Sequence, residues 1–595
     1  MSTESESNEP GELARSIADL AERSQRVVQR FLERQATSDA FQIPDPRVIA
    51  DAFGKMAQAM LADPHKLAQA QLRWWQQMGE VWQAQLRRAA GEEVEPVAEA
   101  EPGDRRFKDD AWNEELVFDY IKQSYLVSSR WLQETVADVQ GLDPKTKEKA
   151  EFYTRQWVDA LAPTNFVALN PTVLREASET KGESLLRGLK HLLGDLERGS
   201  GQLKISMTNE QAFEVGVNLA TTPGKVVFQN ELFQLIQYAP STATVHKRPL
   251  LITPPWINKF YILDLKPKNS LIKWVVDQGF TVFVISWVNP DKELSGLTFE
   301  DYMTRGQLQA IEAVAAQTGE RELTMVGYCL GGTLTACLLA WMAAQGDDRV
   351  KAVTFLTCML DFSEPGELGV FIDDEQLRLI EEHMDNKGYL EARHMQQVFS
   401  LMRSNDLVWS FVVNNYLLGR EPMAFDLLFW NGDSTRMPRM MHSFYLRNMY
   451  QKNLLVQPGG IELAGVPIDL GAVRTPAYFL STKEDHIAPW RSTYAGAKRL
   501  GGQVRFVLGG SGHIAGVVNP ASSTKYGYWT GTRRPAKAED WLEAATQHDG
   551  SWWPDWRDWL AKKSGPMVPA RDPAAGTLPI LDDAPGSFVK TRAAD

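Results

Sequence analysis

A glycine-flanked cysteine between a strand-like run and a helix-forming run constrains this chain most. The segment GYCLGG (327–332) follows the apolar run LTMV (323–326) and precedes TLTACLLAWMAAQ (333–345). A sharp strand-to-helix turn needs small neighbours, and it holds its central side chain strained and exposed at the carboxyl edge of a sheet. In a chain with 43 glycines such a pattern could arise by chance, but a strand before it and an apolar helix after it are the context that the motif requires. The pattern predicts a nucleophile elbow at Cys329, with cysteine where such elbows usually carry serine.

The sequence pattern changes near Lys204, after which short β-rich runs occur, most of them separated by helical patterns. They lie at 226–228, 249–253, 281–287, 323–326, 353–357, 477–480 and 504–508. Strands that alternate with helices predict a mainly parallel sheet whose site lies at the carboxyl ends of the strands. Together with the elbow, this pattern predicts an α/β fold of the α/β-hydrolase type.

Two further catalytic candidates follow predicted strands. Asp485 lies in the loop after run 477–480, and His513 lies among glycines after run 504–508. Nucleophile, acid and histidine then come in the chain order that is typical of α/β-hydrolases. Glu484 is an alternative acid and His486 an alternative base, although adjacent side chains point in different directions and cannot both face the sulfur.

The chemistry requires these residue types. The thiolate is the attacking form of cysteine, and a reference pKa of about 8.5 leaves little of it at neutral pH, so a histidine must accept the proton. An oxyanion hole needs two backbone donors, one after the nucleophile and one after an earlier strand. Leu330 supplies the first. In PPWIN (254–258) the prolines cannot donate, so Trp256, Ile257 or Asn258 supplies the second, and we name Ile257 and Asn258 as candidates.

The chain of 595 residues is too long for one ordinary domain. We expect a helical N-terminal domain over 1–205, with an irregular start up to about residue 45 and an acidic linker at 91–104. A catalytic domain follows over 206–595, interrupted at about 360–475 by a cap of about 115 residues, which is too long for a loop. An apolar stripe over about 46–90 either packs within the helical domain or docks on an apolar surface or partner helix. It comprises Met56, Met60, Leu67, Leu72, Trp75, Met78 and Trp82.

Composition excludes several classes of function. A net charge of −13 argues against a general nucleic-acid binder. Three cysteines in one short stretch form no disulfide framework and suit a reducing cytoplasm, and Cys337 and Cys358 lie in apolar runs where cysteine acts as a small hydrophobe. No run approaches the ~18 apolar residues that span a bilayer, and no secretion signal is expected. No metal-ligand spacing or phosphate loop is apparent.

Beyond the elbow, several motifs resemble those of the polyhydroxyalkanoate synthases of the single-subunit type, class I. They are PPWINKFYILDL (254–265), FWNGDSTRMP (429–438), EDHIAPW (484–490), SGHIAGVVNP (511–520) and SWWPDW (551–556). The resemblance spans most of the chain, but the first 90 residues share only a helical character. Because several of these motifs have no meaning in a generic hydrolase, the resemblance is specific.

The resemblance implies that a (R)-3-hydroxyacyl-coenzyme A, most commonly 3-hydroxybutyryl, acylates Cys329, and that acyl units pass to a hydroxyl with release of coenzyme A. His513 would activate the cysteine, and Asp485 would act on the substrate hydroxyl directly or through the histidine. No cofactor is implied, since coenzyme A is part of the substrate. The resemblance also implies a homodimer in the cytoplasm, located on the surface of polyester granules. Phasin-type granule proteins are its candidate partners.

The cap aromatics carry a further hypothesis, that the cap shields the cysteine from water. They are Phe399, Trp409, Phe411, Tyr416, Phe425, Phe429 and Trp430. The alternative is that they form the cap's own core. Two alternatives to the synthase remain: a cysteine-nucleophile thioesterase or hydrolase of the same fold, and a non-catalytic granule-associated protein.

Overall fold

The computed structural model describes residues 19–20, 22–27, 29, 41 and 43–593. Most of the expected irregular start therefore lies outside the described residues. The chain divides into two compact units, each described by itself below. Unit 1 comprises Met1–Asn209 and Val398–Ala424, and unit 2 comprises Glu210–Gln397 and Phe425–Asp595.

Unit 1 is helical, and several of its helices begin at a proline. Its elements up to residue 209 are α2 Pro46–Ala62, α3 Pro64–Ala89, α4 Ala111–Glu114, α5 Leu116–Ala137, α6 Pro144–Ala160, the 3₁₀ turn η1 Pro163–Asn165, α7 Pro171–Glu179 and α8 Glu183–Arg198. An Asp or Asn before the proline caps α2, α3, α6 and α7, and its side chain accepts a hydrogen bond from a first-turn amide. Proline suits the first helical position because its missing N–H would have no partner there. These pairs define where α2, α3, α6 and α7 start.

Helix α3 presents apolar side chains on two faces. On one face Val81 is buried, and Trp74 and Met78 pack into a cluster with residues of α4 and α5. On the other face Leu72, Trp75, Trp82 and Leu86 are 56–62% exposed. The apolar stripe predicted over 46–90 is thus divided: Met78 packs within the unit, whereas Leu72, Trp75 and Trp82 face outward.

The acidic segment over 91–104 has neither helix nor strand, yet it packs within unit 1. Ala98 is buried, and its amide donates to Gln123 of α5 at 2.8 Å.

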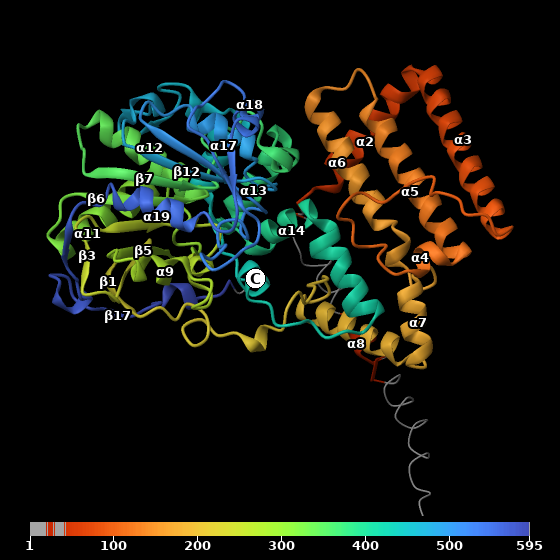
Figure 1. Cartoon of the computed structure of the whole chain (residues 1–595), viewed down its shortest axis with the longest axis horizontal. Coiled ribbons are helices and arrows are strands. Elements are labelled where there is room, and N and C mark those ends of the chain that lie inside the picture. Colours follow the sequence, from red (N-terminus) through yellow and green to blue (C-terminus); the bar gives the residue numbers. More distant parts are fainter. Residues whose placement is uncertain (1–18, 21, 28, 30–40, 42, 594–595) are drawn as a thin grey trace, which may run out of the picture. The chain divides into compact units, whose positions relative to one another are not determined.

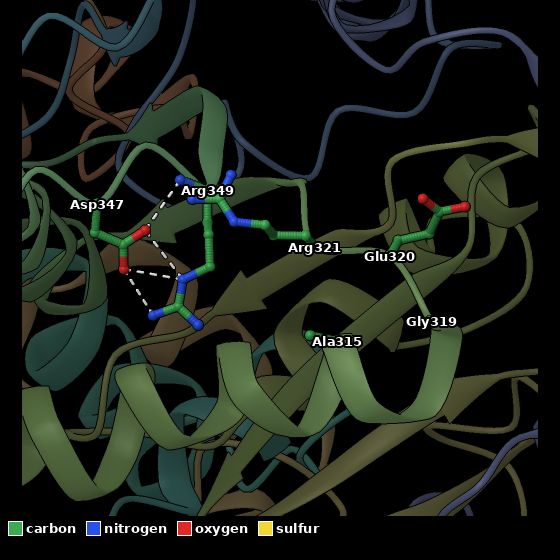
Figure 2. A pocket seen from close by; sticks show the side chains of 6 residues that line it. All are labelled: Ala315, Gly319, Glu320, Arg321, Asp347 and Arg349. Carbon is green, nitrogen blue, oxygen red and sulfur yellow. Dashed lines mark hydrogen bonds and ion pairs between the residues drawn. The ribbon is translucent and has the colours of Figure 1, made fainter.

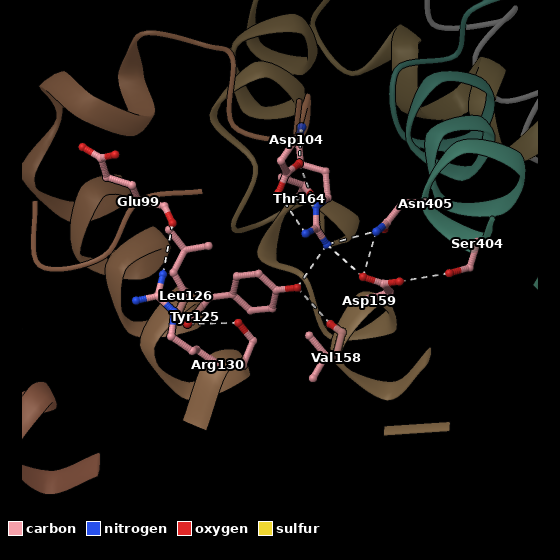
Figure 3. A network of polar contacts seen from close by, with 12 residues as sticks. Glu99, Asp104, Tyr125, Leu126, Arg130, Val158, Asp159, Thr164, Ser404 and Asn405 are labelled. Carbon is pink, nitrogen blue, oxygen red and sulfur yellow. Dashed lines mark hydrogen bonds and ion pairs between the residues drawn. The ribbon is translucent and has the colours of Figure 1, made fainter. Parts of the chain in front are cut away.

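A stretch of the insertion belongs to unit 1. It carries the π-helices η6 Asn405–Trp409 and η7 Val412–Leu417, and α14 (Ala392–Met402) crosses the division at Val398. Asp159 of α6 accepts hydrogen bonds from Ser404 (3.0 Å) and Asn405 (2.8 Å) (Figure 3). Arg106 pairs with the same carboxylate at 3.2 Å. Tyr416 donates to buried Asp195 of α8 at 2.6 Å. Polar contacts between distant parts of the sequence therefore hold this stretch to the N-terminal helices.

Unit 2 is built on a large sheet (Figure 1). The sheet has 11 strands in the order β15-β14-β13-β12-β7-β6-β4-β5-β2-β1-β17. The strands are β1 Gly224–Gln229, β2 Phe233–Tyr238, β4 Leu250–Thr253, β5 Val282–Trp287, β6 Leu323–Tyr328, β7 Val350–Leu356, β12 Ala477–Thr482, β13 Val504–Gly509, β14 Tyr528–Thr530, β15 Thr546–His548 and β17 Asp582–Asp583. The six strands from β13 to β5 are parallel, and antiparallel strands flank them on both edges. All seven predicted strands are present, and the predicted mainly parallel sheet is confirmed.

Helices cover both faces of this sheet. They are α9 Leu271–Asp277, α10 Phe299–Asp301, η4 Tyr302–Leu308, α11 Gln309–Thr318, α12 Leu330–Ala344, α17 Trp490–Ala497, α18 Ala538–Glu543 and α19 Trp553–Ala561. α9 and α19 share one apolar cluster with alternate residues of the strands, including Val326, Tyr478 and Leu480. α12 packs on β6 and β7, and α17 on β12 and β13. The period-2 alternation of the strands thus supplies two buried faces.

The long insertion between β7 and β12 is mainly helical. Its elements in unit 2 are η5 Gly366–Phe371, α13 Asp374–Lys387, α15 Asp426–Gly432, α16 Arg439–Tyr445, η8 Leu446–Gln451, η9 Leu454–Val456 and η10 Leu470–Ala472, with short pairs β8 Tyr389–Leu390 with β9 Met437–Pro438 and β10 Glu462–Leu463 with β11 Val466–Pro467. The remaining pair joins β3 Thr244–His246 to β16 Met567–Pro569, and the turns η2 Glu210–Ala212, η3 Phe260–Asp264, η11 Pro573–Ala575 and η12 Phe588–Lys590 complete the unit. Among the described residues no helix is both long and apolar enough to cross a bilayer.

Candidate active site

Cys329 lies at the turn from β6 into α12, in a strained backbone conformation. Its φ of 51° and ψ of −119° fall where side chains with a Cβ rarely lie, and its side chain is half-buried. A Cβ on Gly327 would lie 2.5 Å from the Gly332 Cα, and one on Gly331 would lie 2.2 Å from the Thr253 carbonyl oxygen. The two glycines are therefore required by close approach, as the elbow motif predicts.

The structure brings Asp485 and His513 together at the carboxyl ends of neighbouring strands. Asp485 follows β12 and His513 follows β13, and the His513 Nδ1 to Asp485 Oδ2 distance is 2.7 Å. The other carboxylate oxygen of Asp485 accepts from the amides of Ile487 (2.9 Å) and Ala488 (2.8 Å). The Thr482 hydroxyl also donates to Oδ2 at 3.2 Å. Asp485 is thus a buried, fully oriented acceptor that faces the histidine.

Cys329 completes the group electrostatically. Burial alone would lower the pKa of His513, but the Asp485 carboxylate and a hydrogen bond with Cys329 favour the imidazolium and raise that pKa to about 10. The raised pKa means that His513 can accept and retain a proton from the thiol. The three residues that sequence order predicted as a triad lie in one interacting set.

The loop that carries His513 is held by tryptophans at the start of α19. The indole N–H of Trp552 donates to the Gly516 carbonyl and that of Trp553 to the Val517 carbonyl, each at 2.9 Å. Ser551 donates to the Asn519 carbonyl at 2.7 Å. Both rings are 1% exposed. The motif SWWPDW thus holds the motif SGHIAGVVNP in place through three hydrogen bonds to its backbone.

Three tyrosines that the sequence analysis did not select lie around the site. The ring of Tyr328 stacks on His513 with centroids 5.8 Å apart. Burial raises the pKa values of Tyr445, at the end of α16, and of Tyr450, in η8, and Cys329 lies near enough to add to both shifts. Tyr328 could have been found as the residue before the nucleophile. No signal in the sequence pointed to the other two.

The candidate oxyanion donors lie on two segments. Leu330 is the first residue of α12, so its amide lies at the N-terminus of that helix. Ile257 and Asn258 lie in the loop after β4, and the start of this loop touches the first turn of α12 through the Thr253 and Pro254 carbonyls. The donors are assigned by this arrangement as candidates only.

The alternative residues have other surroundings. Glu484 is exposed and His486 is half-buried, and the contact with Asp485 is made by His513. Cys337 and Cys358 are buried, and burial raises the pKa of both thiols, to about 12 for Cys337. Both cysteines are therefore held as protonated thiols in the core.

The cap aromatics are distributed over both units. Phe399, Trp409, Phe411 and Tyr416 lie in unit 1. In unit 2, Phe429 and Trp430 are buried in the cluster under the sheet, and Phe425 is 47% exposed. The core alternative therefore fits Phe429 and Trp430, which lie in the cluster against which Cys329 also packs.

A buried group in the insertion could offer ligands to a metal ion. Ligand atoms of His383, Glu391 and His394 lie within 4.8 Å of one another. However, the Glu391 carboxylate already pairs with Lys387 at 3.0 Å and Arg393 at 3.3 Å, so its charge is balanced by protein groups. This group belongs to the ion network of α13 and α14.

A surface pocket near the start of β7 contains no candidate residue. It is lined by Ala315, Gly319, Glu320, Arg321, Asp347 and Arg349 (Figure 2). Arg349 is bound to Asp347 at 2.7 Å. Because this pocket lies where β6 and β7 begin, it is at the opposite edge from the strand ends that carry the triad.

Comparison with protein families finds two matches that together span the site. Residues 103–275 match the N-terminal family of poly-beta-hydroxybutyrate polymerases, and residues 256–520 match the alpha/beta hydrolase fold. The second match includes Cys329, Asp485 and His513. It confirms the fold class.

Curated relatives cover nearly the whole chain. A poly(3-hydroxyalkanoate) polymerase of Methylorubrum extorquens is 51% identical over 91% of this chain and 89% of its own length. A poly(3-hydroxyalkanoate) polymerase subunit of Rhizobium meliloti is 45% identical over 98% of this chain and 96% of its own length. Among solved structures, a monoacylglycerol lipase of Paleococcus ferrophilus covers 55% of this chain and 99% of its own, at 13% identity and a TM-score of 0.31, too low to carry an argument.

Proposed function

Because the chain belongs to the poly(3-hydroxyalkanoate) polymerase family, we propose that it polymerises (R)-3-hydroxyacyl-coenzyme A, foremost 3-hydroxybutyryl-coenzyme A, into polyester with release of coenzyme A. The observation that carries this proposal is a cysteine at a nucleophile elbow, in contact with a histidine that is itself oriented by a buried aspartate. Relatives that bear the polymerase name at 45–51% identity over almost the full length support the reaction class.

In the acylation step, the sulfur of Cys329 attacks the thioester carbonyl, and His513 holds the proton of the thiol. The carbonyl oxygen becomes an oxyanion, which the Leu330 amide and an amide of the loop after β4 stabilise. As the bond to coenzyme A breaks, its sulfur takes the proton from His513. The products are free coenzyme A and an acyl-Cys329 thioester, so atoms and charges balance.

In the transfer step, a 3-hydroxyl group attacks the carbonyl of acyl-Cys329, and His513 accepts the hydroxyl proton. A new ester forms, and the Cys329 sulfur leaves and recovers a proton through His513. Asp485 acts through the histidine in this scheme, because its oxygens already accept bonds from His513, Thr482 and two backbone amides. This arrangement favours a role in which Asp485 orients His513 over one in which Asp485 itself removes the proton of the substrate 3-hydroxyl.

The proposal extends to the surroundings of the enzyme. We expect it to act as a homodimer at the surface of cytoplasmic polyester granules, where phasin-type proteins are candidate partners. We expect it to need no cofactor, because coenzyme A enters as part of the substrate. Light scattering before and after substrate addition tests the dimer. Sedimentation with isolated polyester granules tests the granule location.

The test of function mixes the purified chain with (R)-3-hydroxybutyryl-coenzyme A and follows free coenzyme A by chromatography, since a thiol reagent would also attack Cys329. Turbidity is recorded in parallel, and Cys329→Ala serves as control. Coenzyme A release with growing turbidity that the variant abolishes is expected. Release without polymer would instead identify a thioesterase, and no release would contradict both readings.

A further inference from the structure

The backbone carbonyls of the loop after β4, residues 254–259, accept hydrogen bonds from residues of other segments. The Trp287 indole donates to the Pro254 carbonyl at 2.9 Å, and the Trp430 indole donates to the Lys259 carbonyl at 2.7 Å. Between these ends, Thr435 donates twice: its hydroxyl to the Trp256 carbonyl at 2.5 Å and its amide to the Ile257 carbonyl at 3.4 Å. A short bridge pairs Asn258 with Ser434. Most of these partners come from one segment, residues 430–435, within the motif FWNGDSTRMP.

An ion pair fixes the same segment to the end of the loop. Lys259 Nζ lies 2.6 Å from Asp433 Oδ1, and the two side chains are 3% and 4% exposed. The Tyr261 hydroxyl donates to the other oxygen of Asp433 at 3.0 Å. Desolvation offsets much of the attraction within a buried ion pair, but removal of one partner leaves the other charge buried without compensation. The pair therefore ties the end of the loop to segment 430–435.

The carbonyl contacts dictate where the amides point. A peptide bond is planar and trans, so its N–H points opposite to its C=O. When the Trp256 carbonyl faces the Thr435 hydroxyl, the Ile257 amide must face away from residue 435, and the Ile257 carbonyl fixes the Asn258 amide in the same manner. These are the two candidate oxyanion donors. The start of their loop abuts the first turn of α12, at Gly331, two residues after Cys329.

We propose that Thr435 and Asp433 are positioning residues, which hold the Ile257 and Asn258 amides in place as the second half of the oxyanion hole. This inference rests on the proposed acyl transfer at Cys329. Neither side chain needs to touch substrate. Thr435 orients the peptide planes through the Trp256 carbonyl, and Asp433 fixes the end of the loop through Lys259 and Tyr261.

The decisive variant is Thr435→Val, which keeps the volume and branching of threonine but removes the hydroxyl donor. Acylation by p-nitrophenyl butyrate is measured as the burst of nitrophenol, because this ester reaches the same oxyanion without needing the natural substrate. We expect kcat for acylation to fall between about tenfold and a hundredfold, with KM nearly unchanged. Thr435→Ser should recover most of the rate, and Asp433→Asn should fall in the same direction as Thr435→Val.

A second readout separates positioning from general damage. Alkylation of Cys329 by iodoacetamide needs the thiolate but forms no oxyanion, so its rate should be unchanged in Thr435→Val. The matched control is Thr324→Val, which removes another buried hydroxyl that donates to a backbone carbonyl, that of Pro249, at the start of β6. This control should keep both rates.

Three outcomes would overturn the inference: an unchanged acylation rate in Thr435→Val, a parallel loss of alkylation and acylation, or an equal loss in Thr324→Val. A wild-type chain without any ester burst would overturn it as well. Failure of the proposed function is seen separately, as a wild-type chain that reacts with the ester but makes no polymer from (R)-3-hydroxybutyryl-coenzyme A.

Discussion

At Cys329 the backbone adopts φ 51° and ψ −119°, and the contacts around it offset the cost of that conformation. The Cys329 amide donates to the Leu356 carbonyl of β7 at 2.9 Å, and its carbonyl accepts from the amides of Gly332 and Thr333. The elbow is thus fixed from both sides. A sulfur held in this way, beside His513, has its attack direction set before substrate arrives.

Replacing the nucleophile gives the plainest prediction at this scale. Cys329→Ala should reduce coenzyme A release at least about a thousandfold, because the proposed mechanism forms its covalent intermediate on this sulfur. Cys337→Ala should keep the activity and lose only some stability, since this thiol is buried in α12. Chromatography of free coenzyme A and thermal unfolding check the pair. Comparable activity in Cys329→Ala would contradict the assignment.

The Asp485 carboxylate governs the proton on His513. Asp485→Asn removes the charge that raises the pKa of His513, so less of the thiolate–imidazolium pair remains at pH 7. Iodoacetamide alkylation of Cys329 should be slower in the variant at pH 7. Equal rates in the two proteins at pH 7 would contradict the proposed pairing.

The same raised pKa predicts a pH-dependent stability. Because the folded-state pKa of His513, about 10, lies above the unfolded value of about 6.5, the stabilisation is fully present below about pH 6.5 and is lost as pH rises towards 10. The unfolding temperature of wild type minus that of Asp485→Asn should therefore shrink between those limits. A difference that grows with pH over that range would be the opposite of this result.

Among the elements, α19 supports the site without containing any of its reactive groups. Trp552 and Trp553 bind the His513 loop through their indole N–H groups, whereas Trp556 donates to Thr354 of β7 at 2.8 Å. All three rings are equally buried. The tryptophans differ in their hydrogen-bond acceptors: Trp552 and Trp553 bind the His513 loop, whereas Trp556 binds the sheet.

This difference provides a matched pair of variants. Trp553→Phe removes the bond to the Val517 carbonyl and should lower kcat severalfold, with a loss of about 1 kcal/mol in the free energy of unfolding. Trp556→Phe should cost a similar amount of stability but leave kcat unchanged, since Thr354 is in the sheet. Steady-state coenzyme A release and urea unfolding measure both quantities. Equal effects on kcat would assign α19 a purely structural role.

The elements show how far the sequence could be interpreted. The strands β4, β5, β6, β7, β12 and β13 were predictable, because each is a run of β-branched and apolar residues between turn signals, and each site residue follows one of them. β2 was missed, because its buried Gln234 and Gln237 interrupt the apolar pattern. The positions of the tyrosines near Cys329, and the contacts of residues 430–435 with the loop after β4, could not be predicted. They depend on contacts between distant segments, which no local periodicity encodes.

At the scale of the whole molecule, the division of the insertion is the main feature. Val398–Ala424 packs with the N-terminal helices, and the remainder stays with the catalytic sheet. A helical pattern predicts which face of a segment is buried but not against which partner. The sequence therefore predicted an insertion without indicating this division.

Removal of residues 1–209 tests the division. Ser404, Asn415 and Tyr416 would lose their partners Asp159, His191 and Asp195, so the truncated chain should aggregate and be cleaved by protease within 398–424. A second truncation, in which a Gly/Ser linker of roughly ten residues also replaces 398–424, should recover solubility. A simple truncation that stays monomeric and resists cleavage would contradict this account.

The most direct test of the central claim is the mass of the peptide that contains Cys329, isolated after rapid acid quenching of the chain with (R)-3-hydroxybutyryl-coenzyme A. The account predicts a 3-hydroxybutyryl group, or a short oligomer of it, on Cys329, and predicts its accumulation in His513→Gln if the transfer step is slowed more than acylation. An acyl group on another residue, or polymer formation without any acylated Cys329, would contradict it.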